Sequence, residues 1–131
     1  MTPNWKKCIL NINSKIIDAI NNLDKTGQRI VLVIDDKKNF VGTVNDGDIR
    51  RAIKKKIPQD EKIIKIVNKN PFTVSSINSR VEAFNKMTKF NVNQVPIILK
   101  KKIIGIFTLE EILSKKKIDN IFFLMSGGKG L

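Results

Sequence analysis

The chain repeats one short pattern in its middle and near its end. The first copy covers residues 41–49 (VGTVNDGDI) and the second covers residues 104–112 (IGIFTLEEI). Each copy predicts a short apolar strand, a polar residue, an acid three residues after it, and then a helix. Because repeated units of this size bury their cores against each other, the two strand-to-helix junctions are expected to lie side by side. Such junctions are suited to holding an anion.

The residues around each copy predict the same order of elements, β-α-β-β-α. The first unit is expected to contain elements at residues 8–10, 14–26, 30–34 and 40–44 and a helix through Ile53. The second unit is expected to contain them at 72–74, 79–88, 95–99, 103–107 and 110–116. Pro58 breaks the chain between the units, and residues 61–67 are expected to form a short linking helix.

This order predicts an α/β fold in which two β-α-β-β-α repeats pack around a pseudo-twofold axis. A unit of about 60 residues is small for an independent core, so the two should pack sheet against sheet with a cleft between them. The repeats are assigned to residues 8–56 and 70–117, and a linker helix to residues 57–69.

The composition restricts the chemistry. The 131-residue chain has one cysteine, Cys8, and no histidine, which excludes an intrachain disulfide, histidine metal ligands and histidine acid–base catalysis. Cys8 is expected to fill space, and a single thiol suits a reducing cytoplasm, where we expect the protein to reside. No apolar run approaches the roughly 20 residues that span a bilayer, and the first residues lack the apolar stretch of a signal peptide.

The net charge of +13 leaves nucleic-acid binding open as a class of function. Lys-Lys-Lys runs stand at residues 54–56, 100–102 and 115–117. Two of them follow the repeated junctions at predicted helix ends, where lysine complements the helix dipole, and the third is expected in a hairpin turn. Aromatic residues do not interleave with the runs, and abundant Lys, Ile and Asn are typical of AT-rich coding. Solvated ends are therefore favoured over a nucleic-acid surface.

Four stretches of the chain, taken in order, resemble a known family. They are residues 30–35 (IVLVID), 42–51 (GTVNDGDIRR), 70–74 (NPFTV) and 95–97 (VPI). Together with the repeat, they resemble the cystathionine-β-synthase (CBS) domain, which is found in tandem as a Bateman module. The resemblance covers roughly residues 8–116 and implies a regulatory module without catalytic or metal-binding residues of its own.

A narrower resemblance concerns the two ends of the chain. Trp5 and the GTVNDGDIRR stretch look like the CBS pair that precedes a sugar-phosphate nucleotidyltransferase. Residues 120–131 (NIFFLMSGGKGL) are similar to the start of such a transferase, where a glycine-rich loop wraps the nucleotide phosphates. Residues 118–131 are therefore expected to be the truncated start of that domain, and the alternative is a frayed apolar tail. The implied partners are this C-terminal domain and a second copy of the chain in a homodimer.

The resemblance also implies a ligand and the residues that bind it. CBS pairs bind adenosine nucleotides, so AMP or ATP is the expected ligand, and no other cofactor is implied. The hydroxyl and acidic positions of the motif correspond to Asn45 and Asp48 in the first repeat and to Thr108 and Glu111 in the second. The remaining expected ligand-binding residues are Thr73 and Pro96, on strands that line the base pocket, and Arg50, on the phosphate side.

Two alternatives compete with the nucleotide sensor. Thr108 with Glu111, and Asn45 with Asp48, also have the spacing of helix caps, so these residues need only start helices. The module would then be a ligand-free dimerisation scaffold, with Ile49, Ile53, Ile112 and Leu113 as its contact face. Nucleic-acid binding remains a less favoured third class, and a membrane-surface role is not supported because the lysines do not gather on one helix face.

Overall fold

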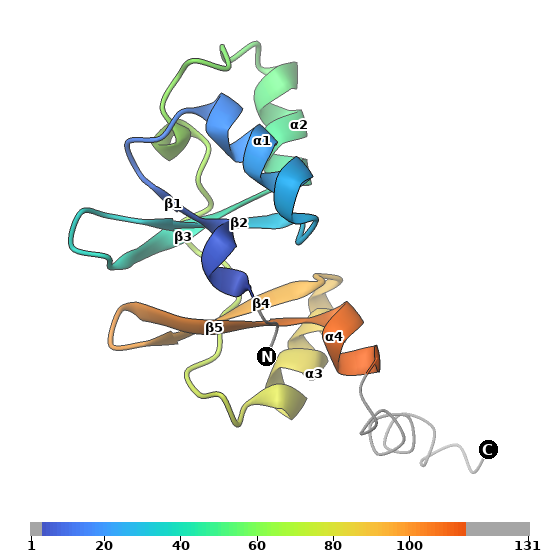
Figure 1. Cartoon of the computed structure of the whole chain (residues 1–131). Helices are drawn as coiled ribbons and strands as arrows, with labels where there is room; N and C mark the ends of the chain where they lie inside the picture. The colour runs from blue at the N-terminus through green and yellow to red at the C-terminus, as the bar shows by residue number, and fades with distance from the viewer. Residues whose placement is uncertain (1–3, 115–131) are drawn as a thin grey trace.

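A computed structural model of the chain describes residues 4–114 (Figure 1). The first repeat is preceded by a 3-10 helix, η1 (Trp5–Cys8). Its elements are β1 (Ile9–Asn11), α1 (Ile16–Thr26), β2 (Ile30–Ile34), β3 (Phe40–Asn45) and α2 (Asp46–Lys54). The second repeat contains α3 (Arg80–Phe90), β4 (Gln94–Leu99), β5 (Lys102–Thr108) and α4 (Leu109–Ser114). The predicted α/β fold with two repeats around a pseudo-twofold axis is confirmed.

Two predicted elements are shorter in the structure. The linking helix expected at 61–67 is a single 3-10 turn, η2 (Ile63–Lys65), because the side chain of Ile63 turns into the core of the first repeat and is fully buried. The first strand of the second repeat is reduced to a parallel bridge between Val74 and Ile97. The expected transferase-like start at 118–131 lies outside the described residues.

The two hairpins share one irregularity that makes the repeat visible in three dimensions. Gly42 pairs with Val33 and Gly105 pairs with Ile97, and in each hairpin the register shifts directly after that pair. The first sheet has the order β1-β2-β3, with β1 parallel to β2, and the second consists of β4 and β5. In Figure 1 the two sheets face each other, with α1 and α2 beyond the first and α3 beyond the second.

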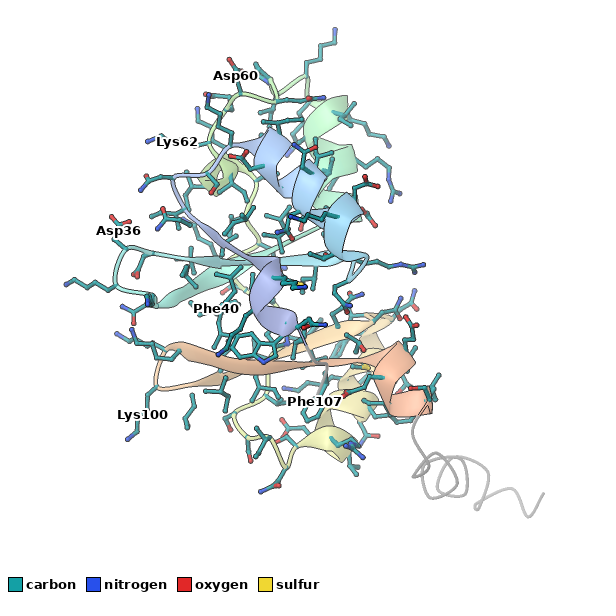
Figure 2. The ribbon with its side chains drawn as sticks, viewed as in Figure 1. Asp36, Phe40, Asp60, Lys62, Lys100 and Phe107 are labelled. Carbon is teal, nitrogen blue, oxygen red and sulfur yellow. The ribbon has the colours of Figure 1, made fainter. Side chains whose placement is uncertain are left out.

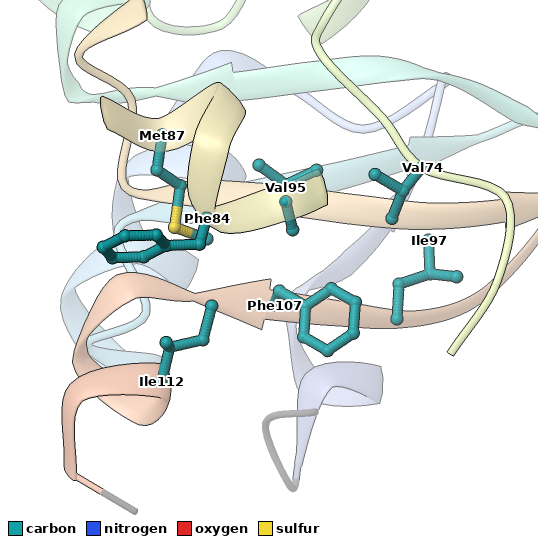
Figure 3. Packing of buried hydrophobic residues seen from close by; sticks show 8 residues of the cluster. Val74, Phe84, Met87, Val95, Ile97, Phe107 and Ile112 are labelled. Atoms are coloured by element: carbon teal, nitrogen blue, oxygen red, sulfur yellow. The ribbon is translucent and has the colours of Figure 1, made fainter. Parts of the chain in front are cut away.

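Strand β2 joins the core of the first repeat to the contact between the repeats. Val31 and Val33 point toward α1 and α2, while Ile30 and Leu32 join a cluster that includes Ile106 of the other sheet. This alternation explains the uninterrupted apolar sequence of β2, since both faces of the strand are buried. A separate cluster forms the core of the second repeat and includes Phe84, Met87 and Phe107 (Figure 3).

The segment that leads into each repeat packs on the other repeat. Before the second repeat, Asn68 forms reciprocal backbone hydrogen bonds with Thr43 of β3, at 2.9 and 3.0 Å. Before the first repeat, Trp5 and Cys8 pack in the cluster that contains Ile106 of β5. Cys8 is fully buried there, and this burial raises the pKa of its thiol, against a hydrogen bond with Thr26 that lowers it.

The predicted dimer face does not exist as a set of four exposed residues. Ile49 and Ile112 are 9% and 1% exposed and belong to the cores of their repeats, because each helix packs that side on its own sheet. Ile53 and Leu113 are exposed, at 61% and 39%. None of the helices between residues 4 and 114 has the length and apolar character that a bilayer crossing needs.

Candidate functional site

The β3–α2 junction is held by a reciprocal pair of hydrogen bonds. The side-chain oxygen of Asn45 accepts from the backbone N–H of Asp48 at 2.9 Å, and Asp48 Oδ2 accepts from the N–H of Asn45 at 3.0 Å. The other carboxylate oxygen of Asp48 accepts from Arg51 Nη2 at 2.5 Å. This capping box explains why the helix begins at Asp46, and it leaves the Asp48 side chain only 11% exposed.

The β5–α4 junction has the same geometry with a more buried cap. Thr108 Oγ1 accepts a hydrogen bond from the backbone N–H of Glu111 at 3.1 Å, and Thr108 is 7% exposed. The N–H of Leu109 donates to the backbone carbonyl of Asn93 at 2.8 Å, which connects this junction to the loop before β4. Glu111 is partly buried, whereas Glu110 is exposed.

Each junction opens onto a cavity that also includes a loop of the other repeat. The first cavity, of about 390 Å³, is lined by residues of the β3–α2 junction and of the loop before β4, together with one residue before β2: Asn45, Asp46, Gly47, Arg50, Arg51, Asn91, Val92, Asn93, Gln94 and Arg29. The second cavity, of about 240 Å³, is lined by the β5–α4 junction and by both loops: Thr108, Leu109, Glu110, Leu113, Gly27, Gln28, Arg29, Asn93 and Gln94. A hydrogen bond from Gln94 Nε2 to the Gln28 carbonyl, at 3.3 Å, joins the two loops.

The two cavities differ in charge. The first contains Arg29, Arg50 and Arg51, three of the four arginines of the chain, and one acid, Asp46. The second contains Arg29 and Glu110, whose charges cancel. Arginine presents a planar fork of N–H donors that fits phosphate oxygens, so the first cavity is the better anion site. The backbone of Arg29 has a φ of 64°, a left-handed conformation that is uncommon for this residue type.

The structure brings some of the predicted site residues together and separates others. Asn45 and Arg50 line the first cavity and Thr108 lines the second. Within the described residues, Asp48 is not among those that line the first cavity; it lines a smaller one, of about 160 Å³, between α2 and the linker, and the two cavities share Arg51. Glu111 lies in the first turn of α4, and its backbone N–H donates to the Thr108 side chain.

Thr73 and Pro96 accept hydrogen bonds within the second repeat through their backbone carbonyls. The Thr73 carbonyl accepts a hydrogen bond from Lys86 Nζ at 2.8 Å, and the Pro96 carbonyl accepts one from the N–H of Val74 at 3.0 Å. Pro96 is fully buried within β4. Within residues 4–114, neither residue is among those that line the two cavities.

Sequence reasoning missed the loop residues that complete each cavity, above all Arg29 and Gln94. Their signal is positional. In both repeats the loop follows a helix that ends in a left-handed residue, Gly27 or Asn91, and leads directly into the buried strand. The two loops occupy equivalent positions in the two repeats, and the hydrogen bond between Gln94 and Gln28 shows that they meet.

Comparisons with known proteins agree with this geometry. The family model described as "CBS domain" matches residues 5–55 and 63–117. Uncharacterized protein RP505 of Rickettsia prowazekii is 32% identical over 102 residues, which are 78% of this chain and 32% of that protein. Uncharacterized protein YlbB of Bacillus subtilis is 30% identical over 113 residues, which are 86% of this chain and 76% of that protein. The chain thus spans about a third of the length of RP505.

Solved structures share the fold at lower identity. The CBS domain protein PAE2072 from Pyrobaculum aerophilum, complexed with AMP, superposes with a TM-score of 0.76 at 22% identity, over 86% of this chain and 88% of that one. The CBS domain pair of protein MJ0100, in complex with 5′-methylthioadenosine and S-adenosyl-L-methionine, has a TM-score of 0.69 at 23% identity, over 87% and 89% of the two chains.

Proposed function

The chain belongs to the CBS domain family, with two repeats in tandem, and from this premise we propose that it is a regulatory module that binds an adenine nucleotide between its repeats. The observation that carries the proposal is the first cavity, which both repeats line and which contains three of the four arginines. PAE2072 in complex with AMP, and the MJ0100 pair in complex with two adenosine derivatives, support adenosine as the shared part of the ligand.

The contacts at the β3–α2 junction suggest how the ligand is received. Arg29 and Arg50 approach the cavity from the first repeat, while residues 91–94 line it from the second, so a ligand held by the arginines would contact both repeats. Asp48 is the residue expected at the ribose, and its Oδ1 now accepts from Arg51, whose side chain is 63% exposed. A ribose hydroxyl can take the place of this guanidinium at Asp48, which releases Arg51 toward the phosphates.

The β5–α4 junction is the weaker candidate. Thr108 lines the smaller, neutral cavity, and Glu111 is the acid expected at a ribose there. A carboxylate with no excess of arginine around it favours an uncharged ligand over a phosphorylated one. We therefore place the nucleotide at the first junction.

We further propose that the module regulates a sugar-phosphate nucleotidyltransferase domain of the same polypeptide, in the cytoplasm and as a homodimer. The support for the transferase is the resemblance of residues 120–131 to the start of such domains. Ligand bound between the repeats would favour one arrangement of the halves and so bias the attached domain. The exposed side chains of Ile53 and Leu113 support a contact with a second copy.

The second candidate function is a ligand-free dimerisation scaffold. It is favoured by the capping box at the β3–α2 junction, since both carboxylate oxygens of Asp48 already have partners within the chain. In this account the same residues only start α2.

Thermal melting with and without millimolar AMP, ADP and ATP separates the two candidates. A nucleotide at 100 times its Kd should stabilise the fold by about 2.7 kcal/mol, a shift of several degrees. Arg50→Ala should abolish that shift, whereas Arg80→Ala, which removes the one arginine outside the cavity, should preserve it. If no nucleotide changes the melting temperature of the wild-type chain, the ligand-free scaffold is the better account. Analytical ultracentrifugation would then test whether the chain forms a dimer.

A further inference from the structure

The two hairpin turns place five lysines at the end of the molecule away from the junctions. Lys37 and Lys38 belong to the β2–β3 turn, Lys100 and Lys101 form the β4–β5 turn, and Lys102 begins β5. We call this set the lysine end. All five residues are exposed. Figure 2 shows Asp36 and Lys100, one from each turn, on the same side of the molecule.

The two turns are bonded to each other, so the lysine end is one surface. The backbone N–H of Phe40 donates to the Lys101 carbonyl at 2.7 Å. Lys102 Nζ donates to the Lys37 carbonyl at 2.5 Å. The lysine run at 100–102 is thus joined to a pair of lysines from the other repeat, which the sequence alone does not indicate.

Three of these lysines occupy backbone positions that disfavour them. The φ angles of Lys38, Lys100 and Lys101 are 64°, 50° and 68°, in the left-handed region where asparagine and glycine are preferred. The other left-handed non-glycine positions of the described residues are Asn4, Arg29, Lys56 and Asn91. An asparagine would therefore suit the backbone at Lys100 and Lys101 better than the lysines do.

The five lysines outnumber the two acids of the first turn, so the surface is positive. Asp35 Oδ1 accepts from the N–H groups of Lys37 and Asn39, at 2.9 and 2.8 Å, and so holds the turn. Asp36 Oδ1 accepts from Asn11 Nδ2 at 3.0 Å. Next to the lysines, Leu99 is 46% exposed.

We propose that the lysine end is a docking surface for an acidic region of a partner protein. Lys100 follows the exposed apolar side chain of Leu99 in the chain and Lys102 pairs with it, a combination that resembles the polar rim and apolar centre of protein interfaces. A phosphate backbone would gain nothing from Leu99, whereas a protein partner can place an apolar side chain against it. Acidic side chains can instead meet the lysines and steer the encounter.

The position of the lysine end fits a regulatory output. Strand β3 runs from the first lysine turn to Asn45, and β5 runs from the second to Thr108. The same two strands therefore connect the docking surface to both junctions. This connection rests on the proposed function, whereas the docking itself does not.

The test uses the full 131-residue chain and a fluorescent poly-L-glutamate as probe, followed by anisotropy without nucleotide. Lys100→Glu with Lys101→Glu should weaken binding by about tenfold or more, because each reversal places like charge against the probe. The matched control reverses Lys54 and Lys55 at the end of α2 and should change the affinity by less than about twofold, since these two lysines do not belong to the lysine end.

A second pair of substitutions separates binding from folding. Lys100→Asn with Lys101→Asn removes two charges and suits the left-handed backbone, so the melting temperature should hold or rise while affinity for poly-L-glutamate falls. Equal losses in the Lys100/Lys101 and Lys54/Lys55 reversals would overturn the proposal, because net charge would then suffice. It would also be overturned if a 20-base-pair DNA duplex or anionic vesicles bound more tightly than poly-L-glutamate through the same lysines.

Discussion

The two strand-to-helix junctions have the same backbone geometry and different electrostatics. At each one a polar side chain accepts a hydrogen bond from the backbone N–H three residues later. Asn45 accepts from Asp48, and Thr108 accepts from Glu111. Three arginines surround the first junction, while the second has Arg29 balanced by Glu110. The repeat therefore determines where a ligand can lie, and substitutions around it determine what charge the ligand can carry.

Both cavities form only when the two sheets pack against each other. Disrupting this packing should therefore lower the stability of the fold more than the other substitutions below. Leu32 is fully buried in the cluster that joins β2 to Ile106 of β5. Leu32→Ala should lower the free energy of unfolding by about 2–5 kcal/mol, through lost burial and the cavity left behind. Urea unfolding measures this loss. The control Ile53→Ala, at an exposed position, should change the free energy of unfolding by less than about 0.5 kcal/mol. Equal effects would show that the sheets do not depend on this cluster.

A substitution at Gly42 tests how the linker segment at Asn68 packs on β3, next to the first junction. A Cβ at this position would lie 2.2 Å from the Asn68 carbonyl oxygen, so the linker backbone must shift. Gly42→Ala should cost about 1–3 kcal/mol of unfolding free energy, as overpacked sites do. Gly27→Ala is a comparison in which nothing lies within 4 Å of the new Cβ but φ is +66°. Hydrogen exchange should show faster exchange of the Thr43 N–H in Gly42→Ala and unchanged exchange there in Gly27→Ala.

The two helix caps allow a direct comparison of folding with binding. Asn45→Ala and Thr108→Ala each remove a side chain that accepts from the first turn of a helix, so each should cost about 1 kcal/mol in urea unfolding. Only Asn45→Ala should also reduce the thermal shift produced by nucleotide, because Asn45 lines the arginine-rich cavity. Loss of the shift in Thr108→Ala alone would reverse our assignment of the two cavities.

The smallest expected effect on stability is that of a substitution in a hairpin turn. Hydrogen bonds from the N–H groups of Asn39 and Lys37, together with the charge of Lys102, hold the pKa of Asp35 below its ordinary value. Because the folded pKa is depressed, the stabilisation is present above the unfolded pKa of about 3.9 and is lost as the pH falls through the folded value. Asp35→Asn should therefore flatten the decline in stability below about pH 4 relative to the wild type. An unchanged pH profile would show that the exposed turn contributes nothing measurable.

The sequence predicted the fold well because the repeat and the alternating burial are local signals. Strand β2 was recognisable from its apolar residues, and the junction caps from the spacing of Asn45 with Asp48. The linking helix was overpredicted, because burial of Ile63 in the first repeat outweighed its helical pattern. Ile49 was expected on an exposed face and lies in the core, since a short helix cannot show from sequence which of its apolar sides meets the sheet.

The site was only half predictable for a different reason. Asn45 and Thr108 belong to the repeated pattern, Arg50 directly follows its first copy, and all three line the cavities. Gln94 reaches the first cavity, and Arg29 the second, from the opposite repeat, so these contacts depend on how the repeats pack. The lysine end has the same origin, because its two turns are remote in sequence and meet only in the fold.

Isothermal titration of AMP and ATP against the wild-type chain, Arg50→Ala and Thr108→Ala tests the central claim most directly. The account predicts one nucleotide per chain, a large loss of affinity in Arg50→Ala, and affinity close to wild type in Thr108→Ala. Two equivalent sites per chain, or binding that survives Arg50→Ala and fails in Thr108→Ala, would contradict the assignment of the nucleotide to the arginine-rich cavity between the repeats.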